Sequence, residues 1–163
     1  MSSRSQLQCC LDVSYRYLAY RPRSEKEMRR RLGREGFAGE VIDEAIGELQ
    51  RQGLIDDAAF ARAWVESRLS SKPRSRRLIE RELAEKAVPE ELVEQATSGI
   101  DDEENAYRLG RRRMRMLEKA GHVEFHRRMT SYLAYRGFPG ALVRRVVSRL
   151  WEERRSGGGL DDG

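Results

Sequence analysis

Residues 24–49 read SEKEMRRRLGREGFAGEVIDEAIGEL, and this stretch decides the fold. Its apolar side chains recur at intervals of three and four residues, the spacing of one face of a helix. They are Met28 and Leu32, followed by Val41, Ile42, Ala45, Ile46 and Leu49. Ser24 stands where an N-cap accepts backbone amides, and Gly36 stands where a helix ends with a positive φ. The stretch therefore predicts two short amphipathic helices joined by a turn.

The same pattern returns twice more along the chain, at a period of about 50 residues. Leu32, Leu83 and Leu133 align, each five residues before a connector that reads Phe-Ala-Gly, Val-Pro-Glu or Phe-Pro-Gly. The other columns are Met28, Ile79 and Met129; Phe37, Val88 and Phe138; Val41, Leu92 and Leu142; Ile42, Val93 and Val143; Ala45, Ala96 and Val146; and Leu49, Ile100 and Leu150. Seven columns in register across three copies indicate an internal repeat.

A less regular helix is predicted ahead of each pair, at about residues 7–20, 60–69 and 105–117. Ser75 repeats the N-cap of Ser24, while Pro89 and Pro139 stop the preceding helix from continuing. Acidic pairs at 56–57 and 101–102 lie just ahead of a helix, where negative charge complements the helix dipole. The expected domains are 1–57, 58–104 and 105–155, followed by a disordered tail at 156–163. Small units of this kind bury little alone, so the predicted fold class is all-α, an elongated curved array of three tandem three-helix repeats.

The composition excludes several classes of protein. Hydrophobic residues make up 39% and charged residues 36% of the 163, which favours thin apolar seams over one deep core. No apolar run approaches the roughly 20 residues that a membrane-spanning helix needs. The N-terminus lacks the build of a secretory signal, and Cys9 and Cys10 are adjacent, too cramped for an ordinary disulfide. We expect a monomeric cytoplasmic protein with no membrane partner.

The positive charge is concentrated in the last third of the chain. The formal net charge is +5, yet residues 1–104 hold 18 basic and 21 acidic side chains. Residues 105–155 hold 14 basic and 4 acidic side chains. Of the 32 basic residues 28 are arginines, whose planar fork suits phosphates, carboxylates and aromatic faces.

A basic stripe is the strongest candidate binding site. Arg108, Arg111, Arg112, Arg115 and Lys119 have the spacing of one helix face. The opposite face, with Ala106, Leu109, Gly110, Met114 and Leu117, is expected to pack inward. Further cations of the same copy could extend the patch: Arg127, Arg128, Arg144, Arg145 and Arg149. Neighbouring like charges repel, and a polyanion or an acidic protein groove would relieve that cost. The alternative interpretation is an arginine-rich face that is exposed to solvent and binds no partner.

The sequence lacks the residue patterns that catalysis, phosphate binding or metal binding would need. Gly33, Gly36 and Gly39 are spaced by three, as suits a helix end, and no phosphate-binding loop motif occurs. His122 and His126 are four apart, but no third ligand completes a zinc site, and the repeat register places them at the entry to a helix. Cys9 and Cys10 are interpreted as packing residues, because no histidine is near in sequence. We therefore expect no enzyme activity, no cofactor and no metal.

Two other function classes remain open from the residues alone. A three-helix unit with a short connector also suggests a helix-turn-helix-like protein that binds duplex DNA. Against it, the third helices of the first two copies carry carboxylates that a phosphate-lined groove would reject: Asp43, Glu44, Glu48, Glu90, Glu91 and Glu94. Only Arg144, Arg145 and Arg149 suit that role. The second of these classes is a helical scaffold that binds an acidic partner.

The chain resembles the RecX family of regulatory proteins. The likeness lies in RPRSEKEM at residues 21–28, Leu32, Gly36-Phe37, Val41-Ile42, Leu49, GLIDD at 53–57 and Phe60-Ala61. It continues in the second copy with RLIEREL at 77–83, Lys86 and Val88, and it covers roughly residues 11–153. The third copy matches by pattern more than by motif. Ala87 stands where the family usually has a glycine, so that helix end is expected to be capped differently.

The resemblance implies a non-enzymatic modulator of the RecA recombinase. Family members look like curved rods that lie in the helical groove of the RecA–DNA filament and restrain its ATPase, strand-exchange and coprotease activities. The same resemblance implies a role in homologous recombination, DNA repair and the SOS response. The expected partner is the RecA filament, with single-stranded or duplex DNA as a possible direct contact. Arg108 to Lys119, with Arg127 and Arg128, are expected to meet the acidic surface of the filament or its DNA.

Overall fold

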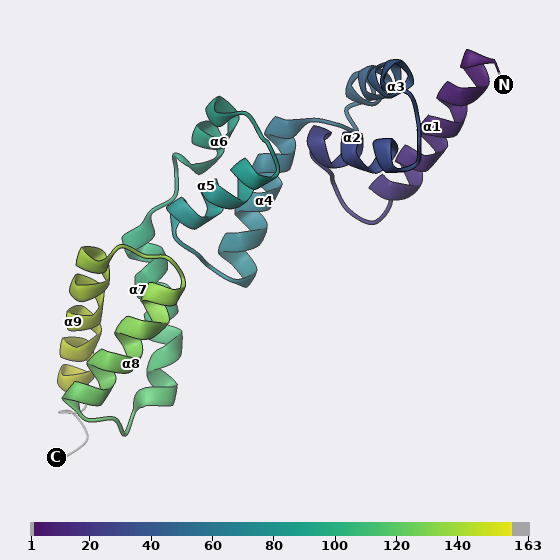
Figure 1. Ribbon diagram of the computed structural model, residues 1–163. Coiled ribbons are helices and arrows are strands. Elements are labelled where there is room, and N and C mark those ends of the chain that lie inside the picture. The colour runs from purple at the N-terminus through teal and green to yellow at the C-terminus, as the bar shows by residue number, and fades with distance from the viewer. Residues whose placement is uncertain (1, 158–163) are drawn as a thin grey trace. The chain divides into compact units, whose positions relative to one another are not determined.

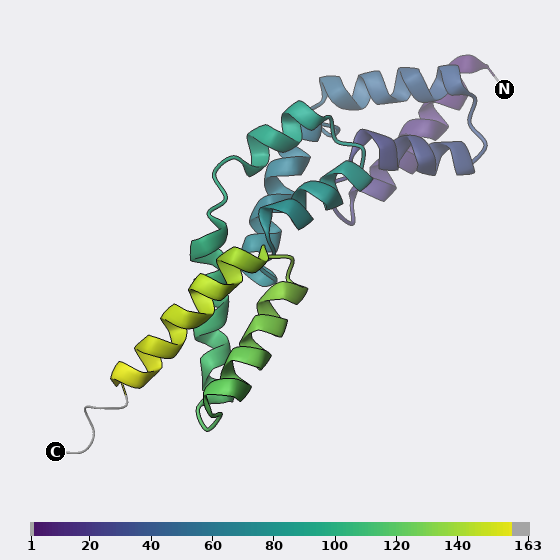
Figure 2. The same cartoon turned by 60° about the vertical axis from the view of Figure 1, so that its left-hand side comes forward.

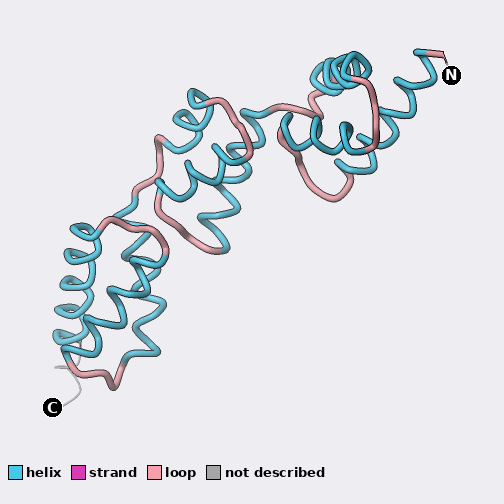
Figure 3. The backbone as a smooth tube through the Cα atoms, viewed as in Figure 1, coloured by secondary structure: helices cyan, strands magenta, loops and turns pink. Residues whose placement is uncertain are grey.

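The structure is a computed structural model that describes residues 2–157. These residues form nine α-helices and one short 3-10 helix, with no strand among them (Figures 1 and 3). The helices group into three tandem three-helix repeats, as the sequence predicted. The chain packs into two compact units, one of residues 2–65 with Glu82–Ser98 and one of Glu66–Arg81 with residues 99–157. The second repeat is shared between the two units, and each unit is described by itself.

The first repeat consists of α1 (Ser3–Leu18), α2 (Glu25–Arg34) and α3 (Gly39–Arg51). Helix α1 packs against both α2 and α3. Their buried side chains form one cluster: Cys10, Leu11, Met28, Leu32, Val41, Ile42, Ala45, Ile46, Leu49 and Ile55. The apolar residues predicted from residues 24–49 all belong to it, so the spacing of three and four identified the core correctly.

The second repeat consists of α4 (Asp57–Ser71), α5 (Arg76–Glu85) and α6 (Glu90–Thr97). Ile79, Leu83 and Val93 are buried, whereas Leu92 and Ala96, which occupy matching columns, are only half-buried. Trp64 of α4 donates a hydrogen bond from its indole nitrogen to Glu82 of α5, at 2.8 Å. This repeat has a thinner core than its neighbours.

The third repeat consists of α7 (Asp102–Met114), the 3-10 helix η1 (Arg115–Leu117), α8 (His122–Tyr135) and α9 (Gly140–Gly157). The three α-helices pack on one another as a bundle (Figure 2). Met129, Leu133, Val146 and Leu150 are among the side chains of its buried core. Residues 156 and 157 belong to α9 rather than to a disordered tail, and the rest of the expected tail lies outside the described residues. Helix α7 also begins at Asp102, three residues before the expected start of this repeat.

The predicted helix caps are confirmed in detail. Ser24 and Glu27 form a capping box, in which each side chain accepts the other's backbone amide. Ser75 Oγ accepts from the Leu78 amide at 3.2 Å. Gly36 and Gly137 have φ values of 88° and 86°, which are the left-handed helix ends that the sequence indicated.

The expectation that the helix end at Ala87 is capped differently from the other two is wrong. Its φ is 52°, so an alanine adopts the left-handed conformation that glycines adopt in the other two repeats. The Val88 amide donates to the Leu83 carbonyl at 3.1 Å, as Phe37 does to Leu32 and Phe138 to Leu133, both at 3.4 Å. The helix end is thus capped in the same way as the others, because the hydrogen bonds and the buried Val88 impose the geometry on a residue that disfavours it.

Replacing Ala87 with glycine should stabilise the protein. A non-glycine residue in this conformation costs roughly 1–2 kcal/mol, and the greater freedom of glycine in the unfolded chain takes back part of the gain. We expect a rise of about 0.5–1 kcal/mol in the free energy of unfolding, measured by urea denaturation. Ala63→Gly, on an exposed position inside α4, is the control and should lose about 1 kcal/mol. A loss of stability in Ala87→Gly would contradict the strained cap.

The acidic pairs join one repeat to the next. Asp56 accepts from the Ala59 amide at 3.1 Å, while Asp57 reaches back to the Glu25 amide at 3.0 Å. In the second unit Asp102 accepts from the Arg76 amide at 2.8 Å, and the preceding Asp101 caps its own helix. The first carboxylate of each pair therefore caps the helix that follows, and the second caps a helix of the preceding repeat. Burial raises the pKa of both Asp57 and Asp102, although each backbone hydrogen bond opposes that rise.

Candidate functional site

Helix α7 divides into a buried face and a basic face, as predicted. Ala106, Leu109 and Gly110 are buried, whereas Arg108, Arg111 and Arg112 are exposed. A Cβ atom added at Gly110 would strike the Leu150 side chain, so glycine lets α7 approach α9 closely. This approach places the arginines of α7 beside those of α9.

The basic stripe does not continue along one helix, which corrects the sequence interpretation. Helix α7 ends at Met114, Arg115 starts η1, and Lys119 lies in the turn that follows, off the helical face. The guanidinium group of Arg154 explains the change, because it donates to the carbonyls of Leu117 and Ala120 at 2.7 and 2.6 Å. These carbonyls are satisfied by a side chain of α9 instead of by further helical turns.

A shared network holds part of the predicted patch between α7 and α9. The Tyr107 hydroxyl donates to the carboxylate of Glu153, whose oxygens lie 2.7 and 2.8 Å away. Arg111 donates to the same hydroxyl at 3.3 Å, and Arg149 lies over the Tyr107 ring, 3.8 Å from its centroid. The hydrogen bond to Tyr107, with the nearby charge of Glu153, raises the pKa of Arg111. Two predicted site residues, Arg111 and Arg149, therefore meet around one tyrosine.

Three further site residues form ion pairs at the surface. Arg108 contacts Glu104 at 3.1 Å on the same helix, and Arg128 contacts Glu124 at 3.3 Å on α8. Arg145 of α9 reaches Glu103 of α7 at 3.5 Å. Pairs this exposed contribute about 0–1 kcal/mol each, so a bound anion can displace them at little cost.

The remaining predicted residues are exposed cations without a hydrogen bond or ion pair to any described residue. They are Arg112, Arg115, Lys119, Arg127 and Arg144. Arg112 and Arg115 line a pocket together with Arg111, which belongs to the network around Tyr107. Within the described residues, no contact joins Arg127 on α8 or Arg144 on α9 to the cations of α7.

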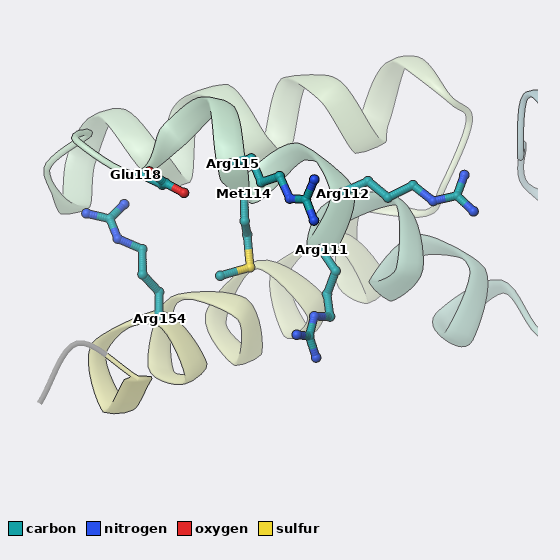
Figure 4. Close-up of a pocket in the computed structure, with 6 residues that line it drawn as sticks. All are labelled: Arg111, Arg112, Met114, Arg115, Glu118 and Arg154. Carbon is teal, nitrogen blue, oxygen red and sulfur yellow. The ribbon is translucent and has the colours of Figure 1, made fainter. Parts of the chain in front are cut away.

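A shallow pocket of about 590 Å³ lies between α7, η1 and α9 (Figure 4). Its lining residues are Arg111, Arg112, Met114, Arg115, Glu118 and Arg154. Met114 projects between the two helices, and Arg154 extends from α9 on the side of Glu118. The pocket gathers four guanidinium groups and one carboxylate, a composition that favours an anionic partner.

Sequence reasoning missed Arg154 and Arg113. Arg113 lies over the Tyr132 ring at 4.9 Å, where Arg136 also approaches at 5.3 Å. Neither arginine fits the spacing of the basic stripe, so no pattern along the chain marks it. Only the packing of α8 and α9 against α7 reveals their positions.

The two histidines considered as metal ligands lie beside each other and beside an aromatic side chain of α9. His122 starts α8, as predicted, and its ring lies 4.2 Å from that of His126 and 4.9 Å from that of Trp151. Burial, followed by the charge of His122, lowers the pKa of His126. No group of three or more potential metal ligands occurs in the part of the chain that the structure describes.

The two cysteines differ in their surroundings. Cys10 packs in the core of the first repeat, and burial raises its pKa to about 11, which keeps the thiol protonated. Cys9 is exposed, so its interpretation as a packing residue was wrong. The two neighbours point to different sides of α1, because consecutive residues are about 100° apart on a helix.

Comparison with known families accounts for nearly the whole chain. Three family descriptions match in order: "RecX, first three-helix domain" at residues 10–49, "RecX, second three-helix domain" at 56–96 and "RecX, third three-helix domain" at 101–147. None of the helices within residues 2–157 is long and apolar enough to cross a membrane.

Individual proteins that are similar to this chain carry the same family name. A regulatory protein RecX of Amycolatopsis mediterranei (strain U-32) is 35% identical over 145 residues, which cover 87% of this chain and 83% of the relative. The regulatory protein RecX of Streptomyces coelicolor is 33% identical over 144 residues, covering 86% and 77%. The crystal structure of RecX from Lactobacillus salivarius superimposes with a TM-score of 0.77 at 19% identity, covering 90% of this chain and 97% of that one.

Proposed function

The chain belongs to the RecX family of regulatory proteins, and we therefore propose that it binds the filament that the RecA recombinase forms on DNA and restrains its activity. The restrained activities are the ATPase, strand-exchange and coprotease reactions of the recombinase. The protein acts by binding, without chemistry of its own.

One observation carries the choice of binding surface. Arg112 and Arg115 are exposed and unpaired beside the pocket between α7 and α9, where Arg111 and Arg154 add two more guanidinium groups. Exposed like charges in one place destabilise the free protein, and an anionic polymer or an acidic protein surface removes that cost. We assign the filament contact to this surface, with Arg108, Arg145 and Arg149 at its border. Lys119, Arg127, Arg128 and Arg144 remain candidates for a wider contact.

The mechanism is a shift between states of the filament. In the proposal the first two repeats lie along neighbouring RecA protomers, while the third repeat holds the polyanion. A ligand that bridges protomers in one helical state stabilises that state by its differential affinity. A filament held in one state is restrained in its extension, and thereby in its reactions.

The decisive test is the DNA-dependent ATP hydrolysis of RecA with and without this protein. We expect a fall in the rate of hydrolysis at equimolar protein. An unchanged rate would overturn the proposed function. If the protein bound duplex DNA with salt dependence while leaving hydrolysis unchanged, a DNA-binding protein acting without a recombinase would replace the proposal.

Replacing Arg111, Arg112 and Arg115 together with alanine should weaken filament binding. Each lost cation removes one charge-assisted contact and leaves one counterion unreleased, so the salt dependence of binding flattens as the affinity falls. We expect a loss of roughly tenfold in affinity at moderate salt, measured by co-sedimentation or fluorescence anisotropy.

The matched control changes Arg4, Arg62 and Arg77 to alanine; all three are exposed and have no hydrogen bond or ion pair to another residue of the described range 2–157. It has the same net charge as the test variant, so it separates a local contact from a general charge effect. A test variant that behaves like this control would move the contact away from α7.

A further inference from the structure

The first compact unit carries its own concentration of cations around Tyr17, a residue near the C-terminal end of α1. Two depressions of about 620 and 270 Å³ share this side chain. We name them together the Tyr17 groove. The first is lined mainly by Arg16, Tyr20, Arg23 and Arg31. The second is lined mainly by Lys26, Arg30, Arg34 and Lys86.

The carboxylates of the Tyr17 groove are already engaged. Glu27 accepts from Arg21 at 2.5 Å and from Lys86 at 2.9 Å, and Glu35 is paired with Arg31 at 2.8 Å. Glu85, the third carboxylate of the lining, also has a partner. These pairs neutralise only part of the positive charge that lines the groove.

Four cations of the Tyr17 groove are exposed and have no hydrogen bond or ion pair to any described residue: Arg16, Lys26, Arg30 and Arg34. Three of them recur every four residues along α2, so they lie in a row on one face of that helix. Such a row destabilises an isolated helix, and nothing in the first repeat requires it for packing. Its natural counterpart is a chain of regularly spaced negative charges.

The aromatic side chains of the groove define the kind of polyanion. Arg23 covers the ring of Tyr17 at 3.8 Å from the centroid, which leaves that face occupied. Tyr20, in the loop between α1 and α2, is 86% exposed, and within residues 2–157 no cation or aromatic ring packs on its ring. Tyr20 shares its depression with Arg16, and the row of cations on α2 lines the adjoining depression, which Tyr17 also borders. An exposed tyrosine ring in this position can stack on an unpaired base, while the cations contact the adjoining phosphates.

We propose that the Tyr17 groove binds single-stranded nucleic acid, with Tyr20 stacking on a base and Arg16, Lys26, Arg30 and Arg34 contacting backbone phosphates. A duplex keeps its base faces stacked inside, and an acidic peptide offers carboxylates but no planar surface for Tyr20. The exposed ring and the row of cations together favour a single strand. This site is separate from the surface between α7 and α9 and goes beyond the proposed function.

The test measures the binding of a fluorescein-labelled oligothymidylate by fluorescence anisotropy at several salt concentrations, without recombinase. The full chain with Arg111, Arg112 and Arg115 changed to alanine serves as the parent, so that the third repeat contributes little. Changing Lys26, Arg30 and Arg34 to alanine in this parent should lower the slope of log affinity against log salt by about 2. That value follows because each phosphate contact to a single strand contributes about 0.7.

The stacking contact is tested separately. Tyr20→Ala should weaken binding roughly tenfold, while Tyr20→Phe keeps the ring and should stay within about twofold of the parent. Changing Arg4, Arg62 and Arg77 to alanine is the control for net charge and should leave the salt slope unchanged. A photoreactive 5-bromodeoxyuridine oligonucleotide should cross-link to the peptide that contains Tyr20.

Three results would overturn the proposal. The first is a parent that does not bind the oligonucleotide. The second is a groove variant with the same salt slope as the control. The third is a labelled polyglutamate peptide that binds with the same dependence on Tyr20 while the oligonucleotide does not, which would assign the groove to an acidic protein segment. None of these results determines the outcome of the ATPase test, so either proposal can fail while the other stands.

Discussion

Gly137→Ala is expected to lower the free energy of unfolding of the second compact unit by about 3 kcal/mol. The φ of Gly137 is 86°, a conformation that costs an alanine roughly 1–2 kcal/mol. An added Cβ would also lie 2.7 Å from Ser75 Oγ and would collide with the Leu78 side chain. Forcing an extra methyl group into a packed site costs typically 1–3 kcal/mol.

The surroundings of Gly137 have little room to move. Ser75 is fully buried and its hydroxyl caps α5, while its amide donates to the Arg136 carbonyl at 3.0 Å. A shift of Ser75 that accommodates the methyl group would strain these hydrogen bonds. The turn after α8 is therefore fixed against the start of α5, which joins the third repeat to part of the second.

Gly36→Ala is the matched control for this prediction. Gly36 has a φ of 88°, but a Cβ there would meet nothing within 4 Å. Urea unfolding should therefore show a loss of only about 1 kcal/mol, the conformational part alone. Equal losses in the two variants would mean that the turn at Gly137 is not packed on α5.

Glu27→Gln is expected to lower the stability of the first compact unit by roughly 3 kcal/mol at neutral pH. Burial opposes the ionisation of Glu27, yet hydrogen bonds from Arg21, the Ser24 amide and Lys86 outweigh it and lower its pKa from 4.5 to about 2. Each unit of difference in pKa corresponds to 1.36 kcal/mol. The Glu27 side chain is only 13% exposed, so solvent screens these contacts weakly.

The pH dependence of Glu27 has a definite sign. A carboxyl group whose pKa is lower in the folded state stabilises the protein fully above its unfolded value of 4.5. That stability is lost as the pH falls from about 4.5 through about 2. The stability of the wild-type protein and of Glu27→Gln should converge over this window, in a series of urea titrations at falling pH.

The comparison with the variant isolates Glu27 from its neighbours. The raised pKa of Asp57 gives the opposite trend, but both proteins retain this residue and burial is the largest cause of the rise, so most of its effect cancels; the charge of Glu27 contributes least to that rise. Glu44→Gln, at an exposed position of α3 that forms no ion pair with any residue that the structure describes, should change stability by less than about 0.5 kcal/mol at any pH. A gap that persisted below pH 2 would show that Glu27 acts through packing instead of through its charge.

The repeat architecture could be predicted from sequence because the core is local. Met28, Leu32 and their counterparts are buried where periodicity alone placed them, and Ser24 and Ser75 cap helices as their positions indicated. These features depend on neighbours within a few turns of the chain. The left-handed Ala87 could not be predicted, because three-dimensional packing overrides the preference of the residue.

The candidate sites were less predictable because they depend on contacts distant in sequence. Arg154 ends the helical stripe of α7 from 37 residues away, by its bond to the Leu117 carbonyl. The Tyr17 groove could not be predicted from the sequence, because the net charge of the first 104 residues is slightly negative. In the folded chain the carboxylates that line the Tyr17 groove are engaged, while a row of cations along α2 has no partner within residues 2–157, so the groove offers positive charge to a partner.

The acidic pairs at the starts of α4 and α7 have a practical consequence for chimeric proteins. In each junction the acceptor is an aspartate side chain, but the donor is a backbone amide, Glu25 in one case and Arg76 in the other. Every non-proline residue supplies that donor. The aspartate contact at each junction should therefore survive an exchange of repeats among relatives, provided that the downstream segment brings its own two aspartates. The exchanged repeats must also match the contacts of Lys86 with Glu27 and of Gly137 with Leu78, which cross the same junctions.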